Sequence, residues 1–183
     1  MLSQQYLKEC FDYNPDTGDL IWKKRPRSHF NSTGGMRSFN ARFPNEIAGF
    51  FLRSKKHNII YRNIRLKGKS YLIHRVIWML VYGKFPESQI DHINRNGLDN
   101  RILNLREVTA SENCKNRGLK SSNKTGITGV YFHKLTKKWA AQISFKNGRN
   151  YHIGLYVDFF EACCARKAAE YNAGFHENYG REI

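Results

Sequence analysis

Residues 89–116 constrain this chain more than any other stretch, because strand, turn and helix signals there surround several groups able to do chemistry. Isoleucines flank the adjacent pair Asp91 and His92, so we expect the pair to lie at the end of a short buried strand. An Asn-Gly pair at 96–97 predicts a turn, and residues 104–108 predict a second strand. Two strands joined by a polar loop would thus present the Asp-His pair.

A short helix is predicted after the second strand. Thr109 has the character of an N-cap, with Glu112 as its capping-box partner. Asn113 then lies in the first turns of that helix, free to point back at Asp91. A carboxylate oxygen can hold a hard divalent cation, and the imidazole of His92 can take a proton from water near neutral pH. The stretch therefore predicts one metal-sized space beside a base.

The same stretch resembles the HNH nuclease family, whose core is a ββα-metal fold, and in particular its phage and intron-encoded homing endonucleases. The segments that carry the resemblance are I-H-R-V-I-W at 73–78, D-H-I-N at 91–94, N-R-I-L-N-L-R at 100–106 and S-E-N at 111–113. The resemblance implies that Asp91 and Asn113 hold the metal. It also implies that His92 is the general base and that Asn104 ties the loop to the histidine and fixes its ring. Oxygen ligands favour Mg²⁺ or Mn²⁺ over Zn²⁺.

Two other interpretations of the stretch are weaker. An Asp-His pair taken alone is usually a surface pair or a hydrogen-bonded turn, but the whole spaced set favours a nuclease-type site. A calcium EF-hand loop is the second alternative. It fails because its first position would be His92 and the position that needs a bidentate glutamate is Leu103.

The charge of the chain indicates a polyanionic partner. The net charge is +16 over 183 residues, with 40% of residues apolar, which is typical of a globular protein of one or two domains with a basic surface. Double-stranded DNA is the partner that we expect. An anionic membrane would require an amphipathic basic helix or an apolar anchor, and neither is evident in the sequence.

Location follows from what the sequence lacks. No apolar run approaches the ~20 residues of a membrane span, and the first residues lack the pattern of a signal peptide. We therefore expect an intracellular protein, in the cytoplasm of a bacterial host and encoded by a phage or mobile element, with a monomer favoured. The four cysteines form no C-x₂-C pair, so we expect reduced thiols rather than a zinc knuckle.

The N-terminal region is predicted to be β-rich. We expect a helix over 3–11 capped by Ser3, strands over 20–22, 47–52, 61–66 and 71–73, a loop over 28–46, a basic connection over 53–58 and a helix over 74–82 that Gly83 ends. The basic run 23–27 indicates phosphate contact, with Lys24 and Arg25 as its candidates. Arg75, Arg95 and Arg106 are further candidates for contact with DNA.

His74 opens the helix predicted at 74–82. Its imidazole could reach the scissile phosphate, which makes it a candidate catalytic residue. A histidine at a strand–helix junction is equally often structural, and the sequence leaves both interpretations open.

Residues 118–126 are small, polar and basic, and predict a linker. Beyond it we expect strands over 128–133, 139–145 and 151–154, a hairpin turn over 146–149, and a helix from Asp158 to Asn172 with an alanine face. This part resembles the APETALA-type (ethylene-response-factor) DNA-binding domain. The matching residues are Gly129-Val130, Trp139–Ile143, Ile153-Gly154 and Glu161-Ala162. The resemblance implies a three-stranded sheet in the DNA major groove, braced by the helix.

Alternation divides the residues of that sheet. We expect Val130, Phe132, Trp139, Ala141, Ile143, Tyr151 and Ile153 to face the helix. We expect the DNA-facing set to be Tyr131, His133, Lys138, Gln142, Ser144, Asn150 and His152. The plant domains use several arginines at these places, so their base specificity cannot be carried over. A packing or protein-binding module is the alternative.

The sequence thus predicts an α+β chain. An N-terminal β-rich, DNA-contacting region (1–70) leads into an HNH core (71–117), a linker (118–126), and a three-stranded antiparallel sheet plus helix (127–183). The predicted function is a metal-dependent, site-directed DNA endonuclease that leaves 5′-phosphate and 3′-hydroxyl ends. The rivals are a DNA-binding regulator that keeps the fold without the chemistry, and a structure-selective or RNA-directed nuclease.

Overall fold

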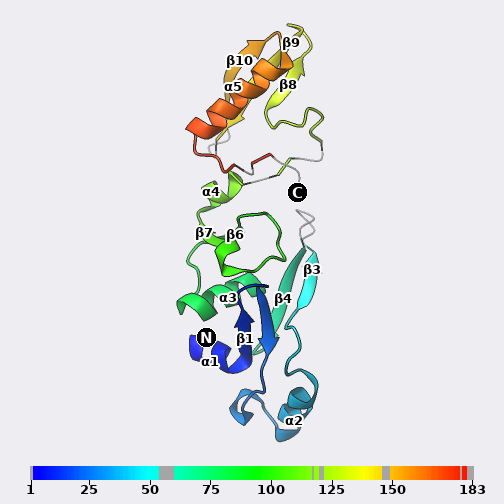
Figure 1. Cartoon of the computed structure of the whole chain (residues 1–183), viewed down its shortest axis with the longest axis vertical. Helices are drawn as coiled ribbons and strands as arrows, with labels where there is room; N and C mark the ends of the chain where they lie inside the picture. Colours follow the sequence, from blue (N-terminus) through cyan, green and yellow to red (C-terminus); the bar gives the residue numbers. More distant parts are fainter. Residues whose placement is uncertain are drawn as a thin grey trace. The chain divides into compact units, whose positions relative to one another are not determined.

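The computed structural model describes residues 2–53, 60–116, 118–119, 122–145, 149–177 and 179–180 (Figure 1). Within these ranges the chain is mixed α/β, with several small antiparallel sheets. It divides into two compact units, residues 1–107 and 108–183. That division falls inside the predicted core 71–117, and the domain boundaries given above stay predictions.

The first unit begins with a helix and a hairpin. α1 (Gln4–Cys10) is capped as predicted, since the Ser3 hydroxyl accepts from the backbone N–H of Tyr6 at 3.2 Å. β1 (Phe11–Asn14), which was not predicted, pairs antiparallel with β2 (Asp19–Trp22). One face of α1 and the hairpin bury Leu7, Cys10, Phe11, Leu20 and Trp22, and this cluster fixes the hairpin to the helix.

The prediction of a loop over 28–46 is wrong. The structure has a 3₁₀ turn η1 (Arg27–His29) and a ten-residue helix α2 (Thr33–Arg42). The Ser32 hydroxyl caps α2 by accepting from the N–H of Gly35 at 3.0 Å. Phe39 packs its ring on Trp22, 5.0 Å between centroids, and on Phe43 at 4.8 Å. These aromatic contacts stabilise a helix whose glycines and polar residues concealed it in the sequence.

A second sheet carries the next helix. β3 (Phe50–Arg53), β4 (Ile60–Leu66) and β5 (Lys69–Leu72) form an antiparallel sheet in that order. α3 (Ile73–Tyr82) packs on it and on α1, and Gly83 ends the helix with a φ of 77°. β3 starts later than predicted, because Ile47 forms only an isolated bridge to Ile21. Most of the predicted basic connection lies outside the described residues.

The Asp-His pair and the predicted second strand form a small hairpin of their own. β6 (Gln89–His92) and β7 (Leu105–Val108) are neighbours in a two-stranded sheet, separated by a polar loop and a 3₁₀ turn η2 (Ile102–Asn104). The backbone N–H of Ile93 donates to the carbonyl of Asn104 at 2.9 Å and closes the base of the loop. The two strands predicted around this loop are confirmed.

The second unit begins with a short helix and continues into a sheet. α4 (Ala110–Cys114) has the predicted capping box, in which the Thr109 hydroxyl and the Glu112 carboxylate each accept from the other's backbone N–H. β8 (Val130–His133), β9 (Lys138–Ser144) and β10 (Asn150–Tyr156) form an antiparallel sheet in the order β10-β9-β8. α5 (Phe159–Asn172), capped by Asp158, lies against the sheet (Figure 1). Most of the predicted turn at 146–149 lies outside the described residues.

The predicted inner face of this sheet needs two corrections. Val130, Ala141 and Ile143 are buried as expected, but Phe132 and Tyr151 are about half exposed. Helix α5 packs mainly on β9 and β10. The hydrophobic residues buried between the helix and the sheet therefore lie at the centre of the sheet only. A bulge between His152 and Gly154 also shifts the register of β10.

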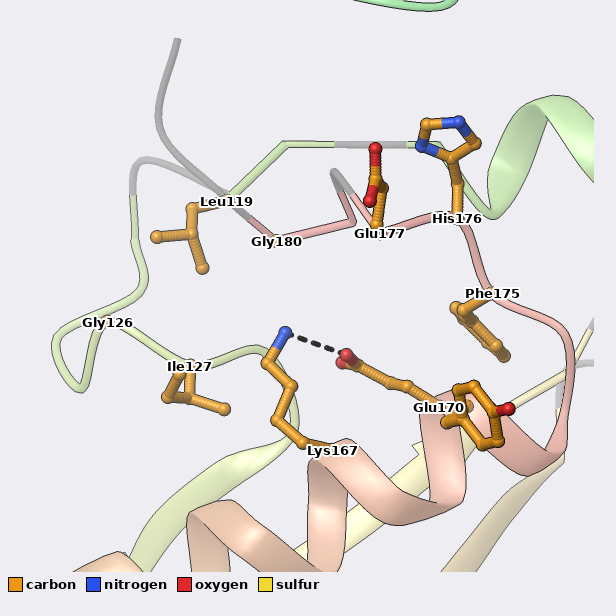
Figure 2. A pocket seen from close by; sticks show the side chains of 10 residues that line it. Leu119, Gly126, Ile127, Lys167, Glu170, Phe175, His176, Glu177 and Gly180 are labelled. Atoms are coloured by element: carbon orange, nitrogen blue, oxygen red, sulfur yellow. Dashed lines mark hydrogen bonds and ion pairs between the residues drawn. The ribbon is translucent and has the colours of Figure 1, made fainter.

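The inner face of α5 is not the predicted alanine stripe. Ala162, Arg166 and Glu170 are its buried residues. A guanidinium nitrogen of Arg166 lies 3.1 Å from a carboxylate oxygen of Glu170, and the ring of Phe175 lies 5.6 Å from that guanidinium. The opposite charges compensate each other where neither could be buried alone. The last turns of α5 also border a cavity of about 790 Å³, where Lys167 reaches Glu170 (Figure 2).

Two chain-wide expectations can be compared with the structure. All four cysteines are free thiols. Among the described residues, no helix combines the length and the apolar character that crossing a membrane requires.

Two glycines of the second unit provide a matched test of its packing. Gly126 and Gly129 both have positive φ, 75° and 81°, but a Cβ on Gly126 would meet nothing within 4 Å. A Cβ on Gly129 would lie 2.3 Å from the carbonyl oxygen of Gln142. We expect Gly126→Ala to cost about 1–2 kcal/mol for the left-handed backbone, and Gly129→Ala about 1–3 kcal/mol more for the clash. Urea unfolding followed by circular dichroism measures both, and equal losses would contradict the tight approach.

Candidate active site

The Asp-His pair occupies the end of β6 and is buried. Asp91 is 8% exposed and His92 is 5% exposed. Strand alternation turns neighbouring side chains to opposite faces, so the carboxylate and the imidazole leave β6 in different directions. Each therefore has its own set of partners.

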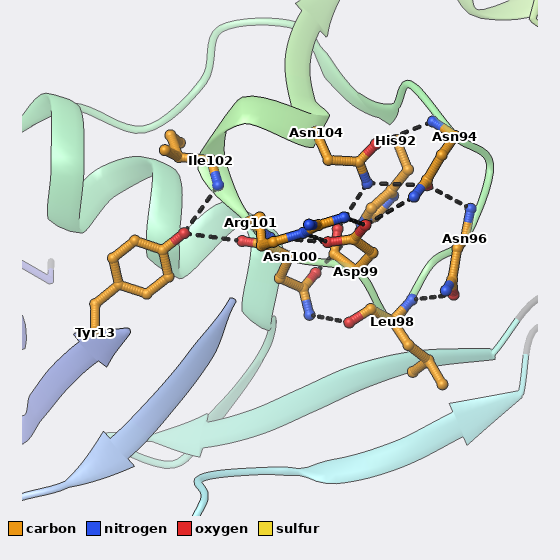
Figure 3. Close-up of polar contacts among 10 residues, drawn as sticks. All are labelled: Tyr13, His92, Asn94, Asn96, Leu98, Asp99, Asn100, Arg101, Ile102 and Asn104. Atoms are coloured by element: carbon orange, nitrogen blue, oxygen red, sulfur yellow. Dashed lines mark hydrogen bonds and ion pairs between the residues drawn. The ribbon is translucent and has the colours of Figure 1, made fainter. Parts of the chain in front are cut away.

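Asn104 organises the loop between the two strands (Figure 3). Its side-chain oxygen accepts from the N–H of Asn94 at 3.0 Å, and its amide donates to the Asn94 side chain at 2.9 Å and to the carbonyl of Asp99 at 2.8 Å. Arg101 pairs with the Asp99 carboxylate at 2.6 Å, and this ion pair lowers the pKa of Asp99. Asn104 thus ties the loop at its base.

A different asparagine holds the histidine ring. Asn100 is 2% exposed, and its side-chain oxygen lies 3.2 Å from Nε2 of His92. The amide nitrogen of Asn100 donates to the carbonyl of Leu98 at 3.2 Å, which leaves the oxygen for the imidazole. With the Asn100 amide in this orientation and the ring neutral, the hydrogen is assigned to Nε2 of His92 and the lone pair to Nδ1. This is the tautomer that a base acting through Nδ1 requires.

Aromatic and imidazole rings surround His92. The ring of His74, in the first turn of α3, lies 5.0 Å from the His92 ring. Tyr61 of β4 lies 5.8 Å from His74 and 6.1 Å from His92. Burial lowers the pKa of His92, and burial with the neighbouring His92 lowers the pKa of His74 to about 3. Both rings are therefore neutral at pH 7, so His74 has no positive charge to offer a phosphate.

The predicted metal ligands fall in different units. The Asp91 carboxylate accepts from Arg106 through two guanidinium nitrogens, at 2.8 and 3.0 Å. It offers the oxygen chemistry that Mg²⁺ takes, but a cation there would share or displace the Arg106 contact. Asn113 lies on α4 in the second unit, so its pairing with Asp91 stays a prediction. No group of three or more His, Cys, Asp or Glu side chains suited to a metal occurs in the part of the chain that the structure describes.

Two of the arginines that were predicted to bind phosphate make contacts within the protein. Arg75 donates to the carbonyls of Pro86 and Ser88, each at 3.0 Å. Arg25 donates to the Tyr6 hydroxyl at 2.7 Å, and its guanidinium lies over the rings of Tyr6, Trp22, Phe30 and Phe39. These contacts make structural roles for both arginines at least as well supported as phosphate contact.

Lys24 and Arg95 have different surroundings. Lys24 is exposed and lines a basic hollow of about 720 Å³ together with Lys8, Lys23 and Arg25. Arg95 lies in a tight turn with a φ of 64°, and its N–H donates to the carbonyl of His92 at 2.8 Å. Of the two, Lys24 is therefore the better placed for a polyanion.

The predicted DNA-facing residues of the second unit share one face of the sheet. Residues Tyr131, Lys138, Ser144, Asn150 and His152 are exposed, and His133 and Gln142 are partly so. Gln142 and His152 are direct cross-strand partners near the centre of that face. The Ser144 hydroxyl donates to the Asn150 side chain, and His133 pairs with the Thr136 hydroxyl at 2.9 Å. The face is polar and offers both donors and acceptors.

Two residues near His92 carried no predicted role. Asn100 lies within the segment that resembles the nuclease family, but the spacing alone does not distinguish it from Asn104. Tyr61 lies outside that segment, in the strand predicted over 61–66, which the structure has as part of β4. No signal in the sequence places its ring beside two histidines.

Comparisons with known proteins show what the segment that carries this site is similar to. Residues 71–115 match the model of the HNH endonuclease family. This segment is similar to HNH nucleases. It spans α3, β6 and β7 and therefore includes His74, Asp91, His92, Asn100 and Asn104.

Part of the chain is also similar to a phage protein. "Protein 3.8" of Escherichia phage T7 is 31% identical over 72 residues, which are 39% of this chain. The chain matches 60% of the length of that protein. No solved structure matches the chain significantly.

The burial of His74 predicts a loss of stability in acid. Its folded pKa of about 3 lies below the unfolded value of 6.5, so below pH 6.5 the unfolded chain binds a proton that the folded chain excludes. The free energy of unfolding should fall by about 1.4 kcal/mol per pH unit for this proton as the pH drops from 6.5 towards 3. We expect His74→Gln to make that fall shallower by the same amount in urea titrations at several pH values. Parallel curves for the two proteins would show that His74 is not buried as a neutral ring.

Proposed function

We propose that this chain is a metal-dependent, site-directed DNA endonuclease of the HNH type, which hydrolyses a phosphodiester bond to a 5′-phosphate and a 3′-hydroxyl. The observation that carries the proposal is the buried Asp91-His92 pair on β6, with the His92 tautomer set by Asn100, inside a segment that matches an HNH model. The net charge of +16 supports a nucleic acid as the substrate.

The residues of the site divide the chemistry between them. His92 takes the proton of the attacking water on Nδ1, while the Asn100 side chain keeps the hydrogen on Nε2. Asn104 holds the loop that carries these groups. Neutral His74 and Tyr61 pack against the His92 ring and restrict its rotation. The base is thus preorganised before substrate binds.

Asp91 and Asn113 are the residues proposed to hold Mg²⁺ or Mn²⁺, as the resemblance to homing endonucleases implies. When bound, such an ion supplies charge stabilisation to the scissile phosphate and to the leaving 3′ oxygen. Arg106 keeps Asp91 oriented in the structure, and it is close enough to Asp91 to contact a phosphate there as well.

The second unit is proposed as the DNA-recognition module, in the manner of APETALA-type domains. Its sheet order, its bracing helix and its polar open face support this. The A-form major groove of duplex RNA is too narrow for such a sheet, which favours DNA over RNA. A regulator without chemistry remains the rival function, and the cleavage assay separates it.

Cleavage should require both the metal and His92. We expect nicking of supercoiled plasmid to stop in EDTA and to return with Mg²⁺ or Mn²⁺. His92→Ala should lower the rate ~10²–10⁴-fold, the usual value of a general base, with duplex binding retained. His176→Ala in the second unit is the matched control. Full activity in EDTA would exclude the metal, and a His92→Ala rate within a few-fold of wild type would place the base elsewhere.

The recognition role is best tested in the full chain. Lys115, one residue beyond α4, donates to the carbonyl of Ala173 at 2.6 Å and lies 5.4 Å from the ring of Phe175. A chain cut after the predicted linker would lose these contacts of the helix that carries Asn113. Point variants on the sheet leave them in place.

We therefore predict the effect of changing the centre of the open face. The double variant Gln142→Ala with His152→Ala should cut a long duplex at more sites, because each good base contact is worth ~1–3 kcal/mol of discrimination. Tyr171→Ala, 86% exposed on α5, is the control. A cleavage map compares the three proteins. An unchanged pattern of sites in the double variant would contradict the assignment of this face.

A further inference from the structure

We propose that the N-terminal β1–β2 hairpin is a positioning element for His92, acting through Tyr13 and Asn100. The proposal rests on the function proposed above and adds residues outside the 71–115 segment to the machinery of the base. Tyr13 on β1 and Asn100 in the loop after β6 are the two connected points.

The hydroxyl of Tyr13 makes two hydrogen bonds to the backbone of the loop (Figure 3). It donates to the carbonyl of Asn100 at 3.2 Å and accepts from the N–H of Ile102 at 2.8 Å. One phenol therefore fixes the peptide groups on both sides of Arg101. A hydroxyl that donates and accepts at once sets the position of both partners.

A second contact from the hairpin reaches Asn100 and Arg101 in the same loop. Gly18, with a φ of 79°, lies so near the loop that a Cβ there would be 2.5 Å from the nitrogen of Arg101 and 2.6 Å from the carbonyl carbon of Asn100. Only glycine permits both that backbone conformation and that approach. The hairpin tip thus packs directly against the backbone of Asn100.

The hairpin is itself held firmly. β1 and β2 pair from Phe11–Trp22 to Asn14–Asp19, and Phe11, Leu20 and Trp22 belong to the main core of the first unit. The side chain of Asn14 caps the turn by accepting from the N–H of Asp16 at 2.9 Å. The support that Tyr13 gives to the loop is therefore fixed by a packed core.

Asn100 connects the hairpin to the imidazole of His92. Its backbone is held by Tyr13 and Gly18, and its side chain holds Nε2 of His92. A shift of the Asn100 backbone would move the acceptor that sets the His92 tautomer. Since misplacement by about 1 Å can cost ~10²-fold in rate, the hairpin governs whether the base is aligned.

A double-mutant cycle tests the connection. We expect Tyr13→Phe to lower the cleavage rate at saturating DNA and Mg²⁺ by about tenfold or more, with the DNA concentration for half-maximal rate unchanged. Asn100→Ala should lower it at least as much. If Tyr13 acts through Asn100, the double variant should be no slower than Asn100→Ala alone. Tyr171→Phe is the control for loss of an exposed hydroxyl.

A measurement that does not depend on DNA cleavage tests the same connection between Tyr13, Asn100 and His92. ¹⁵N nuclear magnetic resonance at pH 7.5 reports which ring nitrogen of His92 carries the hydrogen. We expect an Nε2–H signal in the wild type, and a mixture of tautomers in Asn100→Ala and, to a smaller extent, in Tyr13→Phe. Circular dichroism establishes that each variant is folded, and Gly18→Ala, where it folds, provides a second and stronger perturbation of the same hairpin.

The two proposals fail in different ways. If the wild type does not cut DNA yet the His92 tautomer responds to Tyr13→Phe, the nuclease function falls and the positioning role stands. If the wild type cuts DNA but folded Tyr13→Phe cuts at the same rate with the same tautomer, the positioning role falls. Additive losses in the cycle would also overturn it, because they would mean that Tyr13 acts independently of Asn100.

Discussion

The candidate site depends on one buried hydrogen bond, between Nε2 of His92 and the side-chain oxygen of Asn100. A buried imidazole needs a partner for its N–H, because an unmet polar group in the interior costs about 1–3 kcal/mol. The partner must itself be fixed, and here the Asn104 bonds, the Asp99–Arg101 ion pair and the Tyr13 hydroxyl fix it. The rigidity of the loop is therefore a condition for a defined tautomer.

Charge in this chain has two separate uses. Some cations serve the fold, as Arg25 does in its aromatic surroundings and Arg166 beside Glu170. Others are exposed, such as Lys24 and Lys138, and these give the basic surface that attracts a polyanion. The net charge of +16 thus overstates the number of cations available to DNA. Arg106, paired with Asp91, belongs to the site rather than to the general surface.

Local signals predicted much of the architecture because they depend on neighbours in sequence. The Ser3 cap, the Thr109–Glu112 capping box and the strands around the Asp-His loop are set by interactions within a few residues. Helix α2 was missed because its stabilisation comes from Phe39 packing on Trp22, a contact between segments. The half-exposed Phe132 was missed for the same reason, since the reach of α5 over the sheet is not a property of the strand.

The sequence by itself determined the chemistry available: an acid beside a histidine, asparagines at fixed spacing, and an excess of positive charge. These are properties of residue types and short spacings, and the resemblance to the HNH family that they carry indicated a nuclease. Only the tertiary structure decided that Asn100 rather than Asn104 contacts the His92 ring, that His74 is a buried neutral ring, and that Tyr13 supports the loop from 87 residues away. Burial and contact between distant segments arise when the chain folds, and no local pattern encodes them.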